Sequence, residues 1–291
     1  MLTKEQLQEK IAGGLRFLDG ATGSNLQKAG MPRGCCSEKW ILEHPQALID
    51  LQARYAQAGS QIIYAPTFQA QPIALEKVGL EKDTEKINAQ LVALSREAAP
   101  GCLIAGNLTT LATFTDSYDE ENFDLLVENY RRQIKGLIDG GADLLAAETL
   151  LYPLEAEAIL TAAELEGAGA TMYTFTMQSG GDLFSGRDAA PVLKELAQAG
   201  AAAVGFNCVA ADMMTPGLVS KLRRSVHIPL ICKPNAGNPV IGDDGLAHYP
   251  MAAEEFAQIM ADCVKMGASL LGGCCGTAPE FIAAVKAALQ N

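Results

Sequence analysis

The chain has 291 residues and a formal net charge of −12, and 49% of its residues are hydrophobic while 19% are charged. This composition is typical of a folded protein with a large core and excludes a disordered chain. The acidic balance argues against nucleic acid as a partner, because binding to phosphates needs clustered Lys and Arg. A small molecule is therefore the expected partner.

The first fourteen residues, MLTKEQLQEKIAGG, have helical periodicity and lack the apolar core of a signal peptide. No later segment is long and apolar enough to cross a bilayer, so we expect no membrane association and a cytoplasmic location. In that reducing compartment the eight cysteines are expected to be buried thiols or metal ligands rather than a disulfide framework.

Eight short apolar segments recur along the chain, and helical patterns fill the intervals between them. The predicted strands are 15–20, 61–68, 102–108, 142–149, 171–177, 201–208, 228–235 and 268–275. The predicted helices include 46–59, 84–99, 121–140, 153–167, 189–200 and 251–267. Several strands are almost continuously apolar, as expected for parallel strands buried on both faces.

Eight strand–helix units in one chain predict an α/β protein with a (β/α)8 TIM barrel, and a doubly wound open sheet is the alternative. No linker or charge run divides the sequence, so we expect a single domain over residues 1–291. The N-terminal helix is extra to the repeat and is predicted to cap the bottom of the barrel. The longest connections, 21–45 and 236–250, follow the first and seventh strands and belong to the active face.

The segment LLGGCCGT at residues 270–277 places two adjacent thiols, Cys274 and Cys275, between glycines. Glycines let the backbone turn sharply, whereas neighbouring side chains in a regular strand point to opposite faces. A turning backbone can therefore direct both sulfurs at one metal ion. A phosphate-binding glycine loop or a pair of inert thiols at a tight strand end is about as consistent with this segment alone.

A third thiol, Cys208, ends the predicted sixth strand in the sequence GFNC. One strand separates it from the strand of Cys274 and Cys275, and the carboxyl ends of barrel strands meet at a common mouth. Three thiolates bind zinc at about 2.3 Å and leave a fourth position for water or substrate. Cys208, Cys274 and Cys275 are thus the predicted zinc ligands and catalytic centre, although the usual pair of CxxC motifs is absent.

The other five cysteines are weaker candidates. Cys102 and Cys232 lie in or beside predicted strands and Cys263 lies in a predicted helix, so burial as small hydrophobic residues is expected. Cys35 and Cys36 form a second adjacent pair on the long first connection. They are interpreted as loop thiols without metal, with a four-sulfur structural site as the less favoured alternative.

Two carboxylates, Asp19 and Glu148, end the predicted first and fourth strands. Turn capping explains an aspartate before glycine equally well. Glu148, however, follows the apolar residues LLAA with no charge nearby in the sequence. A carboxylate at the mouth of an acidic, thiolate-rich site suits an ammonium group better than a phosphate. The sequence therefore favours an amino acid as substrate.

Six motifs together resemble one known family, the homocysteine S-methyltransferases. They are LDGATG, APTFQA, AAET, GFNC, KPNAG and LGGCCGT, and they extend over essentially the whole chain. Within the family the chain is most similar to the homocysteine-binding domain of cobalamin-dependent methionine synthase, notably in KPNAGNPV and GGCCGTAPE. Two segments depart from the common pattern: residues 106–110 lack a GPxG-like turn, and Pro66 stands where Asn is common.

The resemblance implies methyl transfer to the thiol of homocysteine, giving methionine, with one Zn²⁺ per chain on Cys208, Cys274 and Cys275. It also implies a homocysteine site formed with Asp19, the backbone at Ala21 and Thr22, and Glu148. Asn235, on the strand between the two cysteine strands, is a hypothetical resting zinc ligand or a group that orients one.

The methyl donor is predicted from the aromatic content. Donors such as betaine or S-methylmethionine favour an aromatic cage, yet 6% of residues are aromatic and one is Trp. A methylcorrinoid carried by a separate protein or domain, such as a cobalamin- or folate-binding subunit, is therefore preferred. The alternatives are methylation of homocysteine from S-methylmethionine or betaine, a thiol-binding module of a multi-component corrinoid methyltransferase with little activity alone, and a barrel that binds a phosphorylated substrate near Gly272 without zinc.

Overall fold

The computed structural model describes residues 1–13, 16–112, 122–178, 180–212, 214–242 and 247–290. Within them, parallel strands form one eight-stranded sheet in the order β1-β10-β7-β6-β5-β4-β3-β2. The strands are β1 Arg16–Phe17, β2 Ile62–Tyr64, β3 Leu103–Thr109, β4 Leu144–Leu150, β5 Thr171–Phe175, β6 Ala203–Ala210, β7 Leu230–Asn235 and β10 Leu270–Leu271. A parallel bridge between Leu18 and Ile62 joins the two ends of this order. The sheet therefore closes, which confirms the predicted barrel over the open-sheet alternative.

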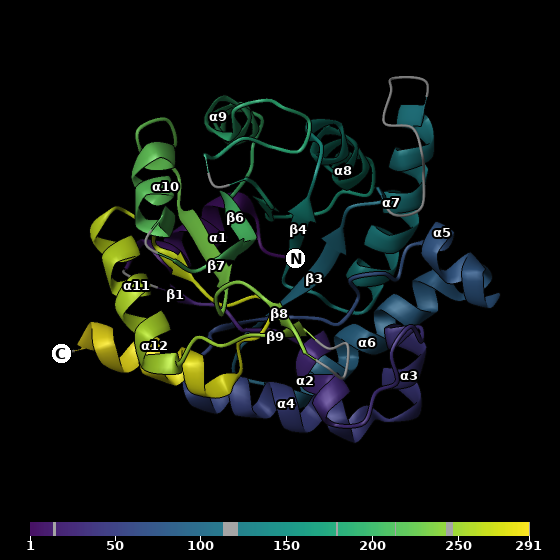
Figure 1. The fold of residues 1–291 in the computed structure, drawn as a ribbon. Helices are drawn as coiled ribbons and strands as arrows, with labels where there is room; N and C mark the ends of the chain where they lie inside the picture. The colour runs from purple at the N-terminus through teal and green to yellow at the C-terminus, as the bar shows by residue number, and fades with distance from the viewer. Residues whose placement is uncertain (14–15, 113–121, 179, 213, 243–246, 291) are drawn as a thin grey trace.

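Helices surround the strands in Figure 1 and cover the outer face of the barrel. They are α2 Gly23–Lys28, α3 Ser37–Glu43, α4 Pro45–Ala58, α5 Pro72–Leu75, α6 Thr84–Ala98, α7 Phe123–Asp139, α8 Pro153–Leu165, α9 Ala189–Gln198, α10 Met214–Arg223, α11 Ala253–Lys265 and α12 Pro279–Gln290, with short 3-10 turns at Glu76–Val78 and Glu81–Asp83. The α4 helix shows why the sequence folds this way. It begins at a proline, buries Leu48, Leu51 and Tyr55 on one face, and ends at Gly59 with φ of 115°.

The N-terminal helix α1, Lys4–Ala12, closes the bottom of the barrel, as the sequence predicts. Its buried residues Leu7 and Ile11 belong to a hydrophobic cluster that also contains Leu18, Ile62 and Leu270 from the barrel strands. Leu2 continues the attachment, because its N–H donates to Asp143 O and its carbonyl accepts from Ala170 N, each at 2.7 Å. The chemistry is consequently restricted to the opposite, carboxyl end of the strands.

The two long connections on that end contain more regular structure than predicted. Residues 21–45 include α2 and α3, and residues 236–250 include an antiparallel hairpin of β8 Val240–Ile241 and β9 Ala247–His248. Leu15 and Glu121, at the starts of a predicted strand and a predicted helix, lie outside the described residues, as do residues 243–246. Of the helices that the structure describes, none is both long and apolar enough to cross a membrane.

Candidate active site

Three thiols meet at the carboxyl ends of β6 and β10. The Sγ atoms of Cys208, Cys274 and Cys275 all lie within 4.8 Å of one another, and those of Cys208 and Cys275 are 3.9 Å apart. Residues about 67 positions apart in sequence are thus brought to one point. Hydrogen bonds from the Cys208 and Cys274 thiols lower the pKa of Cys275, whereas the same sharing of protons raises the pKa of Cys208. The closeness of the three sulfurs is what marks them as a possible set of metal ligands.

Local backbone geometry turns these sulfurs toward each other. Cys208 has φ of 57°, a left-handed conformation that residues other than glycine seldom adopt. On the other side, Gly276 has φ of 82°, and a Cβ there would lie 2.2 Å from the Tyr249 ring. A Cβ on Gly273 would lie 2.3 Å from Thr277 Oγ1. The glycines beside the paired cysteines therefore serve a tight turn, with Tyr249 and Thr277 packed against it.

Two carboxylates and one lysine form the other end of the same cavity. Lys233 Nζ lies 3.1 Å from Asp19 Oδ1 and 3.5 Å from Glu148 Oε2, and 3.7 Å from the centre of the Tyr64 ring. The exposed fractions are 1% for Asp19, 2% for Lys233 and 9% for Glu148. The charge near Glu148 that the local sequence lacks is thus supplied by Lys233, which comes from β7 on the far side of the barrel.

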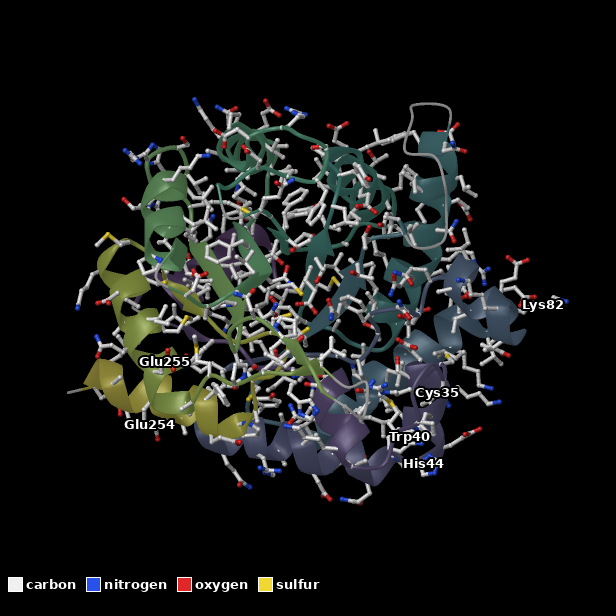
Figure 2. All side chains as sticks on the ribbon, viewed as in Figure 1. Cys35, Trp40, His44, Lys82, Glu254 and Glu255 are labelled. Atoms are coloured by element: carbon white, nitrogen blue, oxygen red, sulfur yellow. The ribbon has the colours of Figure 1, made fainter. Side chains whose placement is uncertain are left out.

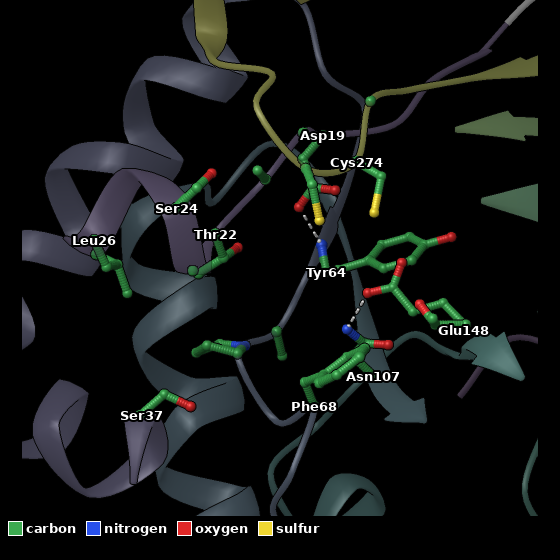
Figure 3. Close-up of a pocket in the computed structure, with 18 of the residues that line it drawn as sticks. Asp19, Thr22, Ser24, Leu26, Ser37, Tyr64, Phe68, Asn107, Glu148 and Cys274 are labelled. Atoms are coloured by element: carbon green, nitrogen blue, oxygen red, sulfur yellow. Dashed lines mark hydrogen bonds between the residues drawn. The ribbon is translucent and has the colours of Figure 1, made fainter. Parts of the chain in front are cut away.

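Further hydrogen bonds fix both carboxylates. Tyr64 N donates to Asp19 Oδ2 at 2.8 Å, and Asn107 Nδ2 donates to Glu148 Oε1 at 2.7 Å. Figure 3 shows both bonds, with the Cys274 sulfur beside the same space and with Ser24 and Ser37 farther from the carboxylates. The cavity has a volume of about 280 Å³. Its dimensions and its mixture of a few polar groups with apolar walls are typical of a small-ligand site.

Burial governs the charge states at this end. Burial raises the pKa of Asp19 to about 6, because the nearby Lys233 and the Tyr64 amide offset only part of the cost of desolvation. The pKa of Glu148 is also raised, mainly by burial. Burial by itself lowers the pKa of Lys233, but Glu148 and Asp19 together raise it well above its ordinary value. Two carboxylates against one ammonium leave room for one further positive charge.

Ala21 and Thr22, whose backbone is predicted to contact the substrate, also line this cavity. Ala21 N donates to Thr277 Oγ1 at 3.2 Å, and Thr277 Oγ1 donates to Cys274 O at 2.7 Å. The Ala21 amide is therefore already engaged with that hydroxyl. Thr277 links this segment to the cysteine turn.

Asn235 does not line the cavity that contains the other predicted substrate-binding residues. It lines a neighbouring cavity, of about 410 Å³, in which Cys208 is the shared residue. The residue is 8% exposed, and its Oδ1 has no hydrogen-bond partner among the described residues. An unpaired buried oxygen in a cavity that Cys208 also lines is free to bind a ligand.

The second cysteine pair is separate from the first. Cys35 is exposed at the periphery near Trp40 and His44 (Figure 2), with its thiol donating to Pro32 O at 3.0 Å. The half-buried Cys36 thiol donates to Glu38 Oε2 at 3.6 Å. Among the described residues, Cys208, Cys274 and Cys275 form the one group of three metal-ligating side chains. This placement favours loop thiols over a four-sulfur site.

The sequence interpretation missed Lys233 as a site residue. A signal was available, since this lysine interrupts the apolar segment IPLIC near the end of a predicted central strand. A charged residue at such a position is buried and must be paired. Asn107 lies near the end of the predicted strand 102–108, but its bond to Glu148 joins residues 41 positions apart and has no local signal.

Comparison with known proteins gives a consistent result. A family model described as homocysteine S-methyltransferase matches residues 16–289. Methionine synthase of Mycobacterium leprae is 27% identical over 98% of this chain. The chain spans only 25% of that relative's length. Homocysteine S-methyltransferase of Escherichia coli is 29% identical, and the alignment covers 93% of this chain and 94% of the relative.

Solved structures show the same likeness. The metallated form of the homocysteine methyltransferase MmuM from Escherichia coli has a TM-score of 0.82 and 26% identity, covering 94% of this chain and 96% of that chain. The apo form of MmuM has a TM-score of 0.75. The oxidized form of MmuM has a TM-score of 0.80, so all three forms share the fold of this chain.

Proposed function

Because the chain belongs to the homocysteine S-methyltransferase family, we propose that it uses one Zn²⁺ to transfer a methyl group to the thiol of homocysteine, giving methionine, with a methylcorrinoid as the donor. One observation carries this proposal. Three thiols and an acidic, lysine-bridged cluster line a single cavity, as a ligand with a thiol at one end and an ammonium group at the other requires.

The three thiols fit a zinc ion. Zinc–sulfur bonds of about 2.3 Å in a tetrahedron separate the sulfurs by about 3.8 Å, close to the 3.9 Å between Cys208 and Cys275. Zn²⁺ on Cys208, Cys274 and Cys275 supplies a Lewis acid that lowers the pKa of a thiol beside it, so that thiolate exists at neutral pH.

The remaining groups bind and orient the amino acid. Asp19 and Glu148 attract the ammonium group, and Lys233 holds the two carboxylates near one another. The backbone N–H groups of Ala21 and Thr22 donate to the substrate carboxylate, which displaces or shares the Thr277 hydroxyl that Ala21 N contacts. With the substrate sulfur directed at the cysteines, a sulfur lone pair forms the new S–C bond, and the methyl group leaves its donor without the bonding electron pair. The thiol proton has by then passed to solvent.

Asn235 has a proposed role when homocysteine is absent. Its unpaired, buried Oδ1 beside Cys208 supports service as a resting ligand or as the group that orients one. We expect Asn235→Ala to alter the spectrum of the Co²⁺-substituted protein without homocysteine and to leave the homocysteine-bound spectrum unchanged. Identical spectra for the variant and the wild type in both states would contradict this role.

The choice of donor depends on the shape of the site. The residues lining the cavity include two aromatic rings, Tyr64 and Phe68, and the Lys233 ammonium already covers that of Tyr64. Within the described residues this falls short of a cage for a sulfonium or quaternary ammonium donor. The competing candidate is a self-sufficient enzyme with such a small donor, S-methylmethionine or betaine, and the nearly end-to-end match to the Escherichia coli homocysteine S-methyltransferase favours it.

One assay separates these candidates. The zinc-loaded chain is incubated with L-homocysteine and, in parallel, methylcobalamin, S-methylmethionine or betaine, and methionine is quantified, with Cys208→Ala as the inactive control. We expect methionine with methylcobalamin alone. Turnover with S-methylmethionine alone would overturn the donor assignment. Homocysteine binding without turnover with any donor would favour a thiol-binding module that needs a second subunit.

A further inference from the structure

Two strained backbone positions line the active cavity, on β4 and β6, strands separated only by β5. Among the described residues, Thr149 and Cys208 are the residues other than glycine with positive φ, at 59° and 57°. Each coincides with a shift of strand register, between Ala147 and Leu150 on β4 and between Asn207 and Ala210 on β6. Such strain persists only where surrounding contacts enforce it.

One buried amide contacts both strained segments. Asn207, which is fully buried, accepts from Thr149 N through Oδ1 at 2.8 Å and donates through Nδ2 to Thr149 Oγ1 at 2.7 Å. The same Nδ2 lies 3.7 Å from Cys274 Sγ. Asn207 also directly precedes Cys208 in the chain. A single residue therefore links the two ends: its side chain reaches Cys274 and the turn after Glu148, and its backbone leads directly into Cys208.

The Thr149 turn has a consequence for substrate recognition. Thr149 follows Glu148, whose carboxylate faces Lys233 and Asn107 in the cavity. A β-branched residue in the left-handed conformation has a strong tendency to relax toward an extended backbone. Loss of the amide that holds Thr149 N and Oγ1 thus moves Glu148 as well. A glycine at position 149 takes the same conformation without support.

We propose that Asn207 is a positioning residue that fixes the thiol end of the cavity relative to its ammonium-binding end. It acts on Cys208 and Cys274 at one end and on Glu148, through Thr149, at the other. This inference rests on the proposed function, since it assigns the two ends to a metal and to the homocysteine ammonium group. It adds a physical link between them that neither the zinc ligands nor the carboxylates provide.

The test uses Asn207→Leu, Thr149→Gly and the double variant. Zinc affinity is measured by competition with a chromophoric chelator. The affinities of the zinc-loaded proteins for L-homocysteine and for 4-sulfanylbutanoate, which lacks the amino group, are measured by calorimetry. The ratio of these two affinities reports the preference for the amino group. The matched control is Asn88→Leu, because Asn88 is equally buried and its amide donates to two backbone carbonyls, Ala70 O and Thr84 O, at 2.8 Å.

We expect Asn207→Leu to weaken zinc binding about 10- to 100-fold, the usual effect of removing an outer-shell partner. The preference for L-homocysteine over 4-sulfanylbutanoate should fall about tenfold, because the Glu148 carboxylate is moved away from the amino group. Adding Thr149→Gly should restore the preference to within about twofold of wild type but leave zinc binding weak, since glycine relieves only the Thr149 turn. Asn88→Leu should lower stability and change neither binding property.

Three results would overturn the proposal. The first is an Asn207→Leu protein with the zinc affinity and amino-group preference of Asn88→Leu. The second is a loss of preference that Thr149→Gly does not reverse. The third is a wild-type chain that binds neither zinc nor homocysteine, which is distinguishable because it also refutes the proposed function. If Asn207→Leu fails to fold, Asn207→Asp replaces it in the test. This variant keeps the acceptor for Thr149 N and removes the donor to Cys274. Unchanged zinc affinity in Asn207→Asp would likewise overturn the proposal.

Discussion

The two ends of the cavity are built in different ways. At the thiol end, sharp turns at the strand ends place the sulfurs, through the left-handed Cys208 and the glycines around Cys274 and Cys275. At the proposed ammonium-binding end, Asp19, Lys233 and Glu148 come from the ends of three different strands, and their buried charges hold one another, although Glu148 also precedes the left-handed Thr149. The thiol end therefore depends mainly on backbone conformation, whereas the proposed ammonium-binding end depends mainly on electrostatic balance, and different substitutions should disable each.

The largest effect is expected at the thiol end. Cys274→Ala removes one of three proposed zinc ligands, so kcat/KM for homocysteine should fall by more than about 100-fold, beyond the range typical of outer-shell groups. Cys263→Ala is the control, because Cys263 is a buried thiol on α11 away from the cavity. Methionine formation and zinc content are measured together. A Cys274→Ala protein that keeps both its zinc and its methionine formation would contradict a zinc site at the thiol end.

At the other end, Lys233→Met should act mainly on stability and substrate affinity. Removing one partner of a buried ion pair costs about 3–5 kcal/mol, and Asp19 and Glu148 are both left without their cation. Protonation of a carboxylate whose folded pKa is raised relieves this cost, so the loss of unfolding free energy should shrink as pH falls from 7 to 5, through the wild-type Asp19 pKa of about 6. Denaturant unfolding at both pH values measures it.

The control for Lys233→Met is Lys265→Met. Lys265 pairs with Asp262 on the exposed surface, where an ion pair contributes about 0–1 kcal/mol. An equal loss in the two variants, or a Lys233→Met deficit that grows as pH falls, would show that charge balance does not organise this end.

A smaller effect is expected from pH on substrate binding. The Asp19 carboxylate attracts the ammonium group when ionised, so homocysteine affinity should fall as pH decreases through about 6, where Asp19 takes up its proton. In Asp19→Asn the affinity for homocysteine should no longer show this decrease below about pH 6. Any decrease that remains should be the same for homocysteine and for 4-sulfanylbutanoate, which lacks the amino group. Calorimetric titration from pH 5 to 8 tests this, and the same acid-side decrease in Asp19→Asn would assign the titration to another group.

The smallest effect is expected for the second cysteine pair. Cys35→Ser changes an exposed side chain that is not part of the group of three thiols, so zinc content and kcat/KM should stay within about twofold of wild type. Loss of zinc from this variant would revive the four-sulfur alternative.

The barrel could be predicted from the sequence because its signals are local. Apolar segments such as IIYAPTF and the glycines after the helices mark where each strand and helix begins and ends, and repetition of the unit fixes the topology. The three cysteines were predictable for a related reason, since strand ends converge in a barrel whatever their separation in sequence.

The remaining features depend on contacts that have no local signal. Lys233 joins Asp19 across 214 positions, and nothing beside either residue indicates the pairing. The position of Asn207 between Thr149 and Cys274 depends on left-handed backbone at residues that usually avoid it. The sequence also does not indicate that Asn235 lines a different cavity from the one that Asp19 and Glu148 line.

The most direct test of the proposed metal centre is the zinc content of the purified protein, measured for the wild type and for Cys208→Ala. Three sulfurs on two strands bind one ion only if Cys208 joins Cys274 and Cys275 across the barrel mouth. We predict one zinc per wild-type chain and its loss from Cys208→Ala with the fold intact. Stoichiometric zinc retained by Cys208→Ala, or no zinc in the wild type after zinc-supplemented purification, would contradict the three-thiol site.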